Sequence, residues 1–326
     1  MSEVKHEVLL QAKGIYKNFE TSKKDQAVHA LTNVDLTLYR GETLALVGES
    51  GCGKSTLGRT LIRMLPATRG SVTFEGQNIT AMKDKEFAPL RRRMQMVFQD
   101  PYSSLDPRMT VEDIIGEPLD VHKLYTNRKE RREKILDLMA TVGLNAEHAT
   151  RYAHEFSGGQ RQRIGIARSL ATNPKFVVCD EAVSALDVSI QSQIINLLSD
   201  LKEQQNLTYL FITHDLSVVR YISDRIGVMY LGNMVEQAES QELFDHPLHP
   251  YTEALLGAIP TTNVDDDREL VILEGDIPSP VNPPKGCKFH TRCKYCTDIC
   301  KMVTPEMEEV RPNHFVACHH ILKDNL

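Results

Sequence analysis

The segment 48–56 constrains the fold of this chain more than any other, because its sequence GESGCGKST matches the phosphate-binding pattern G-x-x-x-x-G-K-[ST]. That pattern binds phosphate where it joins a strand to a helix. The apolar run 43–47 predicts a buried strand before it, and apolar residues at helical spacing from Leu57 to Leu65 predict a helix that ends at Pro66. The expected phosphate-binding residues are Gly48, Glu49, Ser50, Gly51, Cys52, Gly53, Lys54, Ser55 and Thr56.

The residue types in this loop suit phosphate chemistry. Its glycines let successive backbone N–H groups turn toward phosphate oxygens, and the positive end of the following helix faces them. Lys54 would reach the outer phosphates, and the Ser55 hydroxyl would ligate Mg²⁺. Cys52 is expected to fill space in the loop. A chance glycine-rich turn is the alternative, and the predicted strand and helix on either side disfavour it.

A second motif places carboxylates at the end of another predicted strand. Residues 176–179 are apolar, and Asp180 and Glu181 follow directly. Mg²⁺ prefers oxygen ligands in octahedral geometry, so Asp180 would hold the metal ion through a bound water. Glu181 would act as general base toward an attacking water. An acidic strand end in solvent is the alternative, and the upstream phosphate loop disfavours it.

Composition narrows the class of protein. At roughly 150 residues per domain, 326 residues correspond to about two domains. The net charge of −6 disfavours a protein that binds nucleic acid through phosphate contacts. No apolar run reaches the ~18 to 20 residues of a membrane span, and residues 1–10 lack the apolar segment of a secretory signal. We therefore expect a globular protein of the cytoplasm.

The expected elements alternate between strand and helix. Residues 8–47 predict a mainly antiparallel strand region, and residues from 100 to about 168 predict helices. Further strands are expected at 94–99, 176–179 and 209–212, the last two separated by an amphipathic helix. This alternation predicts a parallel sheet with helices on its faces, in the α/β class. After Gln241, closely spaced prolines predict an extended region, which places a boundary near Ala238.

A third motif relates the chain to a family. Residues 156–160, FSGGQ, open a predicted helix and closely resemble the LSGGQ signature of ATP-binding cassette (ABC) ATPases, with Phe156 in place of the leading Leu. The resemblance implies a head-to-tail dimer with two ATP molecules at its interface, in which the signature serves the nucleotide of the partner subunit. A glycine-opened helix N-terminus can donate to phosphate in this way. The residues expected at the partner's nucleotide are Ser157, Gly158, Gly159 and Gln160, and Asp187 belongs to the D-loop motif SALD, which the resemblance implies crosses the dimer interface.

The resemblance also implies roles for three side chains near predicted strands. Gln99 matches the Q-loop glutamine, which would touch Mg²⁺ or the attacking water, and His214 matches the switch histidine at the γ-phosphate. Phe19 stands where an aromatic ring stacks on adenine, with a core aromatic as the alternative. Ala182 replaces the Pro that often follows the base. The expected catalytic residues are Glu181, His214 and Gln99, and the expected Mg²⁺ ligands are Ser55, Gln99 and Asp180.

The second half of the chain narrows the resemblance. The segments FQDPYSSLDP at 98–107, HPLHPYT at 246–252 and IPSP at 277–280 are similar to the ATPase subunits of dipeptide, oligopeptide and nickel importers, and closest to the F-type dipeptide importer ATPase. This implies an α/β fold: a P-loop NTPase parallel-sheet core, an antiparallel β subdomain, a helical subdomain at about 100–168 and a small Cys-rich C-terminal extension. The implied domains are a nucleotide-binding domain at 1–238 and the extension at 239–326.

The same resemblance implies ATP hydrolysis that energises uptake of di- or oligopeptides. The implied partners are a second, related ABC ATPase in a heterodimer, two membrane-spanning permease subunits and, indirectly, a periplasmic or extracellular solute-binding protein, with no nucleic acid. The implied location is peripheral, on the cytoplasmic face of the inner or plasma membrane. Nickel, haem or another solute remains open. A soluble ABC ATPase of translation or repair is disfavoured by the single phosphate loop, and a metal or redox sensor with a vestigial ATPase is disfavoured by the intact motifs.

Cysteines crowd the last 40 residues, at 287, 293, 296, 300 and 318. In a cytosolic chain such a cluster indicates a metal or redox site before it indicates disulfides. Four thiolates suit Zn²⁺ or an iron–sulfur cluster, and the resemblance to importer ATPases with such a tail implies [4Fe–4S]. Cys296 forms C-x₂-C with Cys293, and three histidines could compete, so zinc and free thiols stay open. The expected ligands are Cys287, Cys293, Cys300 and Cys318, with His290, His319 and His320 as competitors.

Overall fold

The computed structural model describes residues 7–22, 26–184, 186–259, 273 and 275–322. These residues form two compact units that each combine distant parts of the sequence. Unit 1 contains Met1–Glu7, Tyr39–Glu42 and Ala81–Ile212. Unit 2 contains Val8–Leu38, Thr43–Thr80 and Thr213–Leu326.

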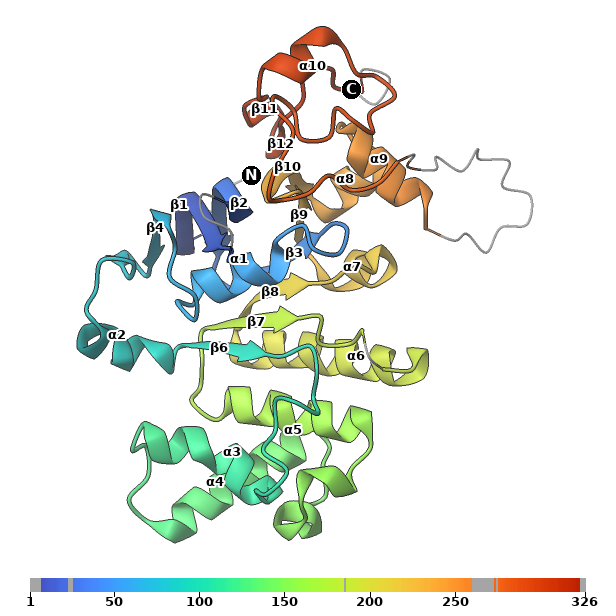
Figure 1. Cartoon of the computed structure of the whole chain (residues 1–326). Coiled ribbons are helices and arrows are strands. Elements are labelled where there is room, and N and C mark those ends of the chain that lie inside the picture. The colour runs from blue at the N-terminus through green and yellow to red at the C-terminus, as the bar shows by residue number, and fades with distance from the viewer. Residues whose placement is uncertain (1–6, 23–25, 185, 260–272, 274, 323–326) are drawn as a thin grey trace, which may run out of the picture. The chain divides into compact units, whose positions relative to one another are not determined.

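Unit 1 is built on three parallel strands, β6 (Met94–Val97), β7 (Phe176–Asp180) and β8 (Thr208–Ile212), in the order β8-β7-β6 (Figure 1). Every residue of β7 and β8 is buried, as short apolar runs in a covered parallel sheet require. The predicted parallel core and its strands are confirmed.

The remaining elements of unit 1 are helical. They are α2 (Asp84–Arg91), α3 (Val111–Val121), α4 (Arg128–Thr141), α5 (Gly158–Leu170), α6 (Val188–Gln205) and 3₁₀ turns at Ala146–Thr150 and Ala153–Glu155. The predicted spacing in α4 buries Ile135, Leu138 and Met139, and Gly143 follows the helix with a φ of 72°. The helices expected between residues 100 and about 168 are thus present, and the bounds of a separate helical subdomain stay a prediction.

Unit 2 contains an antiparallel sheet and a mixed set of strands. The first has the order β2-β1-β4-β5, from β1 (Val8–Glu20), β2 (Ala27–Tyr39), β4 (Arg69–Phe74) and β5 (Gln77–Asn78). In the mixed set, β3 (Thr43–Val47) pairs in parallel with β9 (Arg225–Tyr230). The next strands in the sheet, in order after β9, are β10 (Asn233–Glu239), β12 (His314–Val316) and β11 (Glu308–Arg311). Helices α1 (Lys54–Leu61) and α7 (Leu216–Ile222) also belong to this unit.

Among its described residues, the C-terminal extension has three short helices, α8 (Ser240–Asp245), α9 (Pro250–Gly257) and α10 (Asp298–Met302). The expectation of an extended chain after Gln241 is thus wrong for α8 and α9. Pro250 opens α9 at its first turn, where a missing N–H costs nothing, and the His249 side chain accepts a hydrogen bond from Tyr251 N–H as the N-cap. Pro250 therefore starts a helix rather than preventing one.

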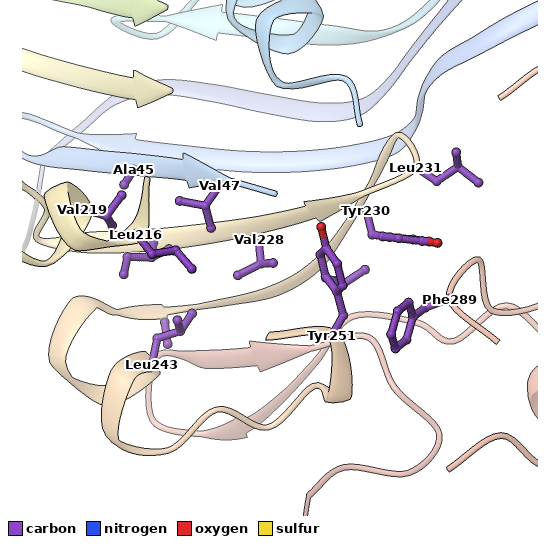
Figure 2. Close-up of a cluster of buried hydrophobic side chains, with 13 residues drawn as sticks. Ala45, Val47, Leu216, Val219, Val228, Tyr230, Leu231, Leu243, Tyr251 and Phe289 are labelled. Atoms are coloured by element: carbon purple, nitrogen blue, oxygen red, sulfur yellow. The ribbon is translucent and has the colours of Figure 1, made fainter. Parts of the chain in front are cut away.

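The extension packs into unit 2 rather than forming a unit of its own. Tyr251 from α9 and Phe289 from the cysteine-rich segment join a buried cluster with Val47 of β3 and Val228 and Tyr230 of β9 (Figure 2). Residues on both sides of position 238 belong to this unit. Among the described residues, no helix is long and apolar enough to cross a membrane.

Candidate functional site

The phosphate loop of unit 2 begins where β3 ends and runs into α1. Gly48, Gly51 and Gly53 have φ values of 143°, 79° and 104°, which residues with a Cβ rarely adopt. A Cβ on Gly48 would meet the carbonyl oxygen of Met229, and one on Gly53 the carbonyl oxygen of Ala30. The loop therefore requires glycine at these two positions. Gly53 is also the N-cap of α1, so no side chain covers the helix N-terminus that would receive phosphate.

Lys54 is a buried cation inside this loop, with 5% of its surface exposed. Its ammonium donates to the carbonyl oxygens of Gly48 at 2.7 Å and Glu49 at 3.0 Å. A phosphate offers charged acceptors, which bind an ammonium more strongly than carbonyls do. Ser55 follows in the first turn of α1. The roles of Lys54 at the outer phosphates and of Ser55 at Mg²⁺ stay predictions.

Two further predicted residues lie in unit 2. His214 is exposed and follows Thr213, whose N–H donates to the carbonyl of Leu46 in β3 at 3.2 Å. His214 therefore lies at the end of β3 where the phosphate loop begins. Phe19 in β1 is half-buried, and the Lys17 ammonium lies 4.9 Å from its ring centroid. The Phe19 ring is thus not part of the fully buried core, and its adenine role stays a prediction.

The carboxylates of unit 1 differ in exposure and in partners. Asp180, the last residue of β7, has no exposed surface, whereas Glu181 is half-buried. Gln99 Nε2 donates to Glu181 Oε2 at 2.6 Å. The φ of Glu181 is 46°, and its N–H donates to the carbonyl of Ile212 at 2.9 Å. The turn thus brings the predicted base to the predicted Q-loop glutamine, 82 residues away in sequence.

The signature begins α5 of unit 1 with a capping box. Gln160 N–H donates to the Ser157 hydroxyl at 3.4 Å, and Ser157 N–H donates to Gln160 Oε1 at 3.1 Å. This reciprocal pair fixes the first turn of the helix. The signature serine and glutamine therefore shape a helix N-terminus, which is the geometry that the phosphate role requires.

The signature glycines allow α5 to approach α6 closely. A Cβ on Gly158 would lie 3.6 Å from Leu186 Cδ2, and one on Gly159 would lie 2.5 Å from Ile190 Cγ2. Asp187, the N-cap position of α6, is exposed. The structure therefore places the signature and the D-loop aspartate side by side within unit 1.

The C-terminal cysteines share one neighbourhood. Burial raises the pKa of Cys293 to about 11 and of Cys318 to about 12, and negative charge on neighbouring thiolates adds to both effects. The neighbours that act on Cys318 include Cys287 and Cys300. All of these cysteines are free thiols. The sequence spacing therefore does bring the four predicted ligands near one another.

This neighbourhood does not have the geometry of a metal site. Within the described ranges, no group of three or more His, Cys, Asp or Glu residues is arranged to hold a metal ion. Cys318 Sγ donates to the carbonyl of His320, the His320 ring bonds the Thr297 hydroxyl at 2.6 Å, and the His319 ring bonds the carbonyl of Val303. The expected ligand set therefore finds no support in the positions of these side chains, and Cys318 and the competing His319 and His320 already bond to other groups of the chain.

Sequence reasoning missed two residues that contact the phosphate loop. The Tyr251 hydroxyl and the Arg292 guanidinium both bond to Glu49. The segment around Tyr251 served only as a mark of the subfamily, and Arg292 received no role. Sequence separations of 202 and 243 residues leave no periodicity to detect.

Comparison with known protein families gives one match in the first part of the chain and one in the C-terminal part. The ABC transporter family matches residues 31–184, and the oligopeptide/dipeptide transporter C-terminal region matches residues 235–300. The oligopeptide transport ATP-binding protein AppF of Bacillus subtilis (strain 168) is 53% identical, over 98% of this chain and 99% of AppF. OppF of the same organism is 51% identical, over 96% of each chain.

Solved structures agree with the fold. The ATP-binding cassette MJ0796, in a dimeric post-hydrolysis state bound to ADP and Pi, matches with a TM-score of 0.65 and 29% identity, over 71% of this chain and 99% of that one. CbiO1 from Clostridium perfringens, part of the ABC transporter complex cbiONQ, matches with a TM-score of 0.64 and 27% identity, over 73% of this chain and 91% of that one.

Proposed function

The chain belongs to the ABC family of transport ATPases, in the branch with the oligopeptide/dipeptide transporter C-terminal region, and we propose that it hydrolyses ATP to energise peptide uptake through membrane subunits. The observation on which the chemical part rests is the hydrogen bond between Gln99 and Glu181, beside the buried Asp180. The peptide part rests on relatives that are named oligopeptide transport ATP-binding proteins.

Binding of ATP uses the loop from Gly48 to Thr56. Backbone N–H groups of the loop and of the α1 N-terminus donate to phosphate oxygens. The Lys54 ammonium exchanges its bonds to the loop carbonyls for the outer phosphates, and Phe19 stacks on adenine. His214, beyond the end of β3, contacts the γ-phosphate.

Hydrolysis needs a group that accepts a proton from water. Glu181 accepts that proton as the water oxygen bonds to the γ-phosphorus, and the bond from this phosphorus to the β–γ bridging oxygen breaks, giving ADP and phosphate. Gln99 holds one carboxylate oxygen of Glu181 at 2.6 Å, which limits rotation of the base.

The proposed ligands of Mg²⁺ are chosen by the chemistry of their side chains. The Ser55 hydroxyl, the Gln99 amide oxygen and the Asp180 carboxylate are oxygen ligands, which Mg²⁺ prefers together with water and phosphate. When bound, Mg²⁺ neutralises charge that develops on the phosphates.

Replacing the base tests the proposed chemistry. Glu181→Gln keeps the shape of the side chain and removes proton acceptance, so we expect kcat for ATP hydrolysis to fall by about 100-fold or more. The Kd for MgATP should stay close to that of the unchanged chain. Lys54→Ala is the matched control, because it should abolish binding. Normal turnover in the Glu181→Gln chain would exclude Glu181 as the base.

The family implies dimerisation and permease partners, and we extend this to a specific arrangement. A second, related ABC ATPase pairs head-to-tail with this chain, so that Ser157 to Gln160 and Asp187 act on the partner's nucleotide. Two membrane-spanning permease subunits receive the motion, and a periplasmic or extracellular solute-binding protein delivers the peptide. The chain then lies on the cytoplasmic face of the membrane as a peripheral subunit.

Co-purification from native membranes tests the assembly. We expect the chain to copurify with two permease chains and a different ATPase, more tightly with MgATP present. We also propose a [4Fe–4S] cluster in the C-terminal extension, and the purified complex can be used to test for it. Its proposed ligands Cys287, Cys293, Cys300 and Cys318 share one neighbourhood, and iron, sulfide and zinc analysis of the complex prepared without oxygen decides between a cluster, zinc and free thiols.

A further inference from the structure

The C-terminal extension makes a bidentate ion pair with the phosphate loop. Arg292 donates through one terminal nitrogen to Glu49 Oε2 at 2.7 Å and through the other to Oε1 at 3.1 Å. Only 5% of the Arg292 side chain is exposed, against 24% for Glu49. A shielded, bidentate pair fixes both distance and orientation of the carboxylate. The position of Glu49 is thus coupled to the position of Arg292.

Tyr251 makes a second contact, to the backbone of the same residue. Its hydroxyl accepts a hydrogen bond from Glu49 N–H at 2.8 Å. The Tyr251 ring is fully buried and packs on Tyr230 and Phe289, with ring centroids 4.8 and 5.3 Å away. Figure 2 shows these three rings together at one end of the buried cluster. The hydroxyl therefore acts as a fixed acceptor for the loop.

A third contact joins Glu49 to the phosphate-binding lysine. The carbonyl oxygen of Glu49 accepts a hydrogen bond from Lys54 Nζ at 3.0 Å and another from Cys52 N–H at 3.3 Å. Glu49 is thus held at its N–H by Tyr251, at its carboxylate by Arg292 and at its carbonyl by groups of the loop itself. Two of these three contacts come from outside the cassette sequence, in the extension.

Arg292 is itself anchored to the cluster that holds Tyr251. Its N–H donates to the carbonyl of Phe289 at 3.0 Å, and its guanidinium lies 6.0 Å from the Tyr230 ring centroid. The flanking Cys287 and Cys293 pack on the same cluster. The extension therefore presents a guanidinium and a hydroxyl to the loop from one packed structure.

We propose that Arg292 and Tyr251 are positioning residues for ATP binding, and that the extension sets the conformation of the phosphate loop through Glu49. The proposal rests on the loop being the ATP site, as proposed above. Neither residue is assigned a contact with phosphate. Both hold the backbone on which the phosphate-binding N–H groups and Lys54 depend, so their loss should weaken nucleotide binding more than it slows the chemical step.

The test compares two ion pairs of the extension in the full chain. Arg292→Gln removes the pair with Glu49, and Arg311→Gln removes the pair with Glu242 (2.8 Å), which does not involve the loop. We expect Arg292→Gln to raise the Kd of a fluorescent ATP analogue with Mg²⁺, and the KM for ATP, by about fivefold to tenfold, with kcat little changed. Arg311→Gln should leave Kd unchanged whatever it does to the thermal midpoint. An unchanged Kd in Arg292→Gln, or equal changes in both variants, would overturn the proposal.

Three further variants separate positioning from damage. Arg292→Lys keeps the charge but not the two parallel N–H donors of the guanidinium, so it should bind ATP more tightly than Arg292→Gln and less tightly than the unchanged chain. Glu49→Gln combined with Arg292→Gln should weaken binding no further than Arg292→Gln alone, because both remove one interaction; additive losses would contradict the coupling. Tyr251→Phe keeps the ring and removes only the acceptor, so it should also raise Kd, and it serves if Arg292→Gln does not fold.

Lys54→Ala separates failure of this inference from failure of the assigned ATP site. If Lys54→Ala abolishes ATP binding while Arg292→Gln and Tyr251→Phe bind normally, the inference is wrong and the site stands. If Lys54→Ala binds ATP normally, the loop is not the ATP site, and both proposals fall.

Discussion

Glu181 adopts a backbone conformation that its side chain disfavours. Its φ of 46° lies in the left-handed region, which costs a residue with a Cβ about 1–2 kcal/mol. The surrounding hydrogen bonds maintain it: Glu181 N–H donates to Ile212, and the N–H and hydroxyl of Ser184 donate to the Glu181 carbonyl. Strain of this kind concentrates at functional sites. Here it turns the carboxylate out of the strand direction and toward Gln99.

At the residue scale, the sequence patterns predicted which residues belong to the site better than they predicted which of these residues contact one another. The glycines, Lys54, Asp180 and Glu181 stand where the motifs placed them, because each motif is local and its geometry follows from adjacent φ and ψ values. The bond between Gln99 and Glu181 was not predicted, because the resemblance related Gln99 only to Mg²⁺ or the attacking water. The contacts of Glu49 with Tyr251 and Arg292 depend on packing of distant segments, which no local pattern encodes.

Gly48 and Gly51 offer a matched pair of substitutions in one loop. Both have positive φ, but a Cβ on Gly48 would meet the carbonyl of Met229, whereas one on Gly51 would meet nothing within 4 Å. Gly51→Ala should cost about 1–2 kcal/mol from φ alone. Gly48→Ala should cost about 2–5 kcal/mol because the overlap with backbone adds to it. Thermal unfolding midpoints check this, and equal losses would show that the close approach at Gly48 is not real.

At the scale of elements, apolar runs and helical spacing predicted the core strands and α4 well. Thr43–Val47 is buried throughout, so its apolar sequence was sufficient to identify it. The prolines near α8 and α9 were misleading, since a proline at a helix start and a proline in a loop look alike without the cap. The cap is a histidine, His249, whose ring nitrogen accepts from Tyr251 N–H. Histidine is not among the usual cap residues.

Two buried histidines beside Glu236 should give unit 2 a stability optimum near neutral pH. Burial lowers the pKa of His249 from 6.5 to about 4. Burial also opposes the charge of His314, but its hydrogen bonds to Glu236 and Glu242 and their charges outweigh this and raise its pKa above 6.5. Arg311 bonds the same Glu242. In the folded chain, the pKa of His249 thus lies below that of an unfolded histidine, and the pKa of His314 lies above it.

The signs follow from which state binds more protons. Below pH 6.5, unfolded His249 takes up a proton that the folded chain refuses, so stability falls as pH drops toward 4, by about 3 kcal/mol. Above pH 6.5, folded His314 keeps a proton that the unfolded chain loses, so stability falls as pH rises through its raised pKa. The free energy of unfolding can be measured by urea denaturation at a series of pH values. His249→Asn should reduce its fall below pH 6.5, and His314→Gln should reduce its fall above pH 6.5. Unchanged profiles in both variants would exclude these residues as the cause.

At the scale of the whole molecule, the order of motifs along the chain predicted the α/β class but not how segments combine. Each unit gathers three stretches of sequence, and such grouping depends on packing between residues far apart. The extension shows this most clearly. Its composition predicts a separate tail, whereas β12 pairs with β10 and Phe289 enters a core shared with β3 and β9.

Shortening the chain at Ala238 tests whether the extension is separable. The deletion removes Leu243, Tyr251 and Phe289 from the shared cluster, and each fully buried side chain of this size contributes about 1.5–3 kcal/mol. Their combined loss approaches the 5–15 kcal/mol by which domains are typically stable. We therefore expect residues 1–238 alone to melt far below the full chain or to aggregate, as followed by circular dichroism. Phe289→Ala in the full chain is the matched control and should lower the midpoint by an intermediate amount. If the shortened chain unfolds cooperatively at the temperature of the full chain, the extension adds nothing to the stability of unit 2, and residue 238 is a true domain boundary.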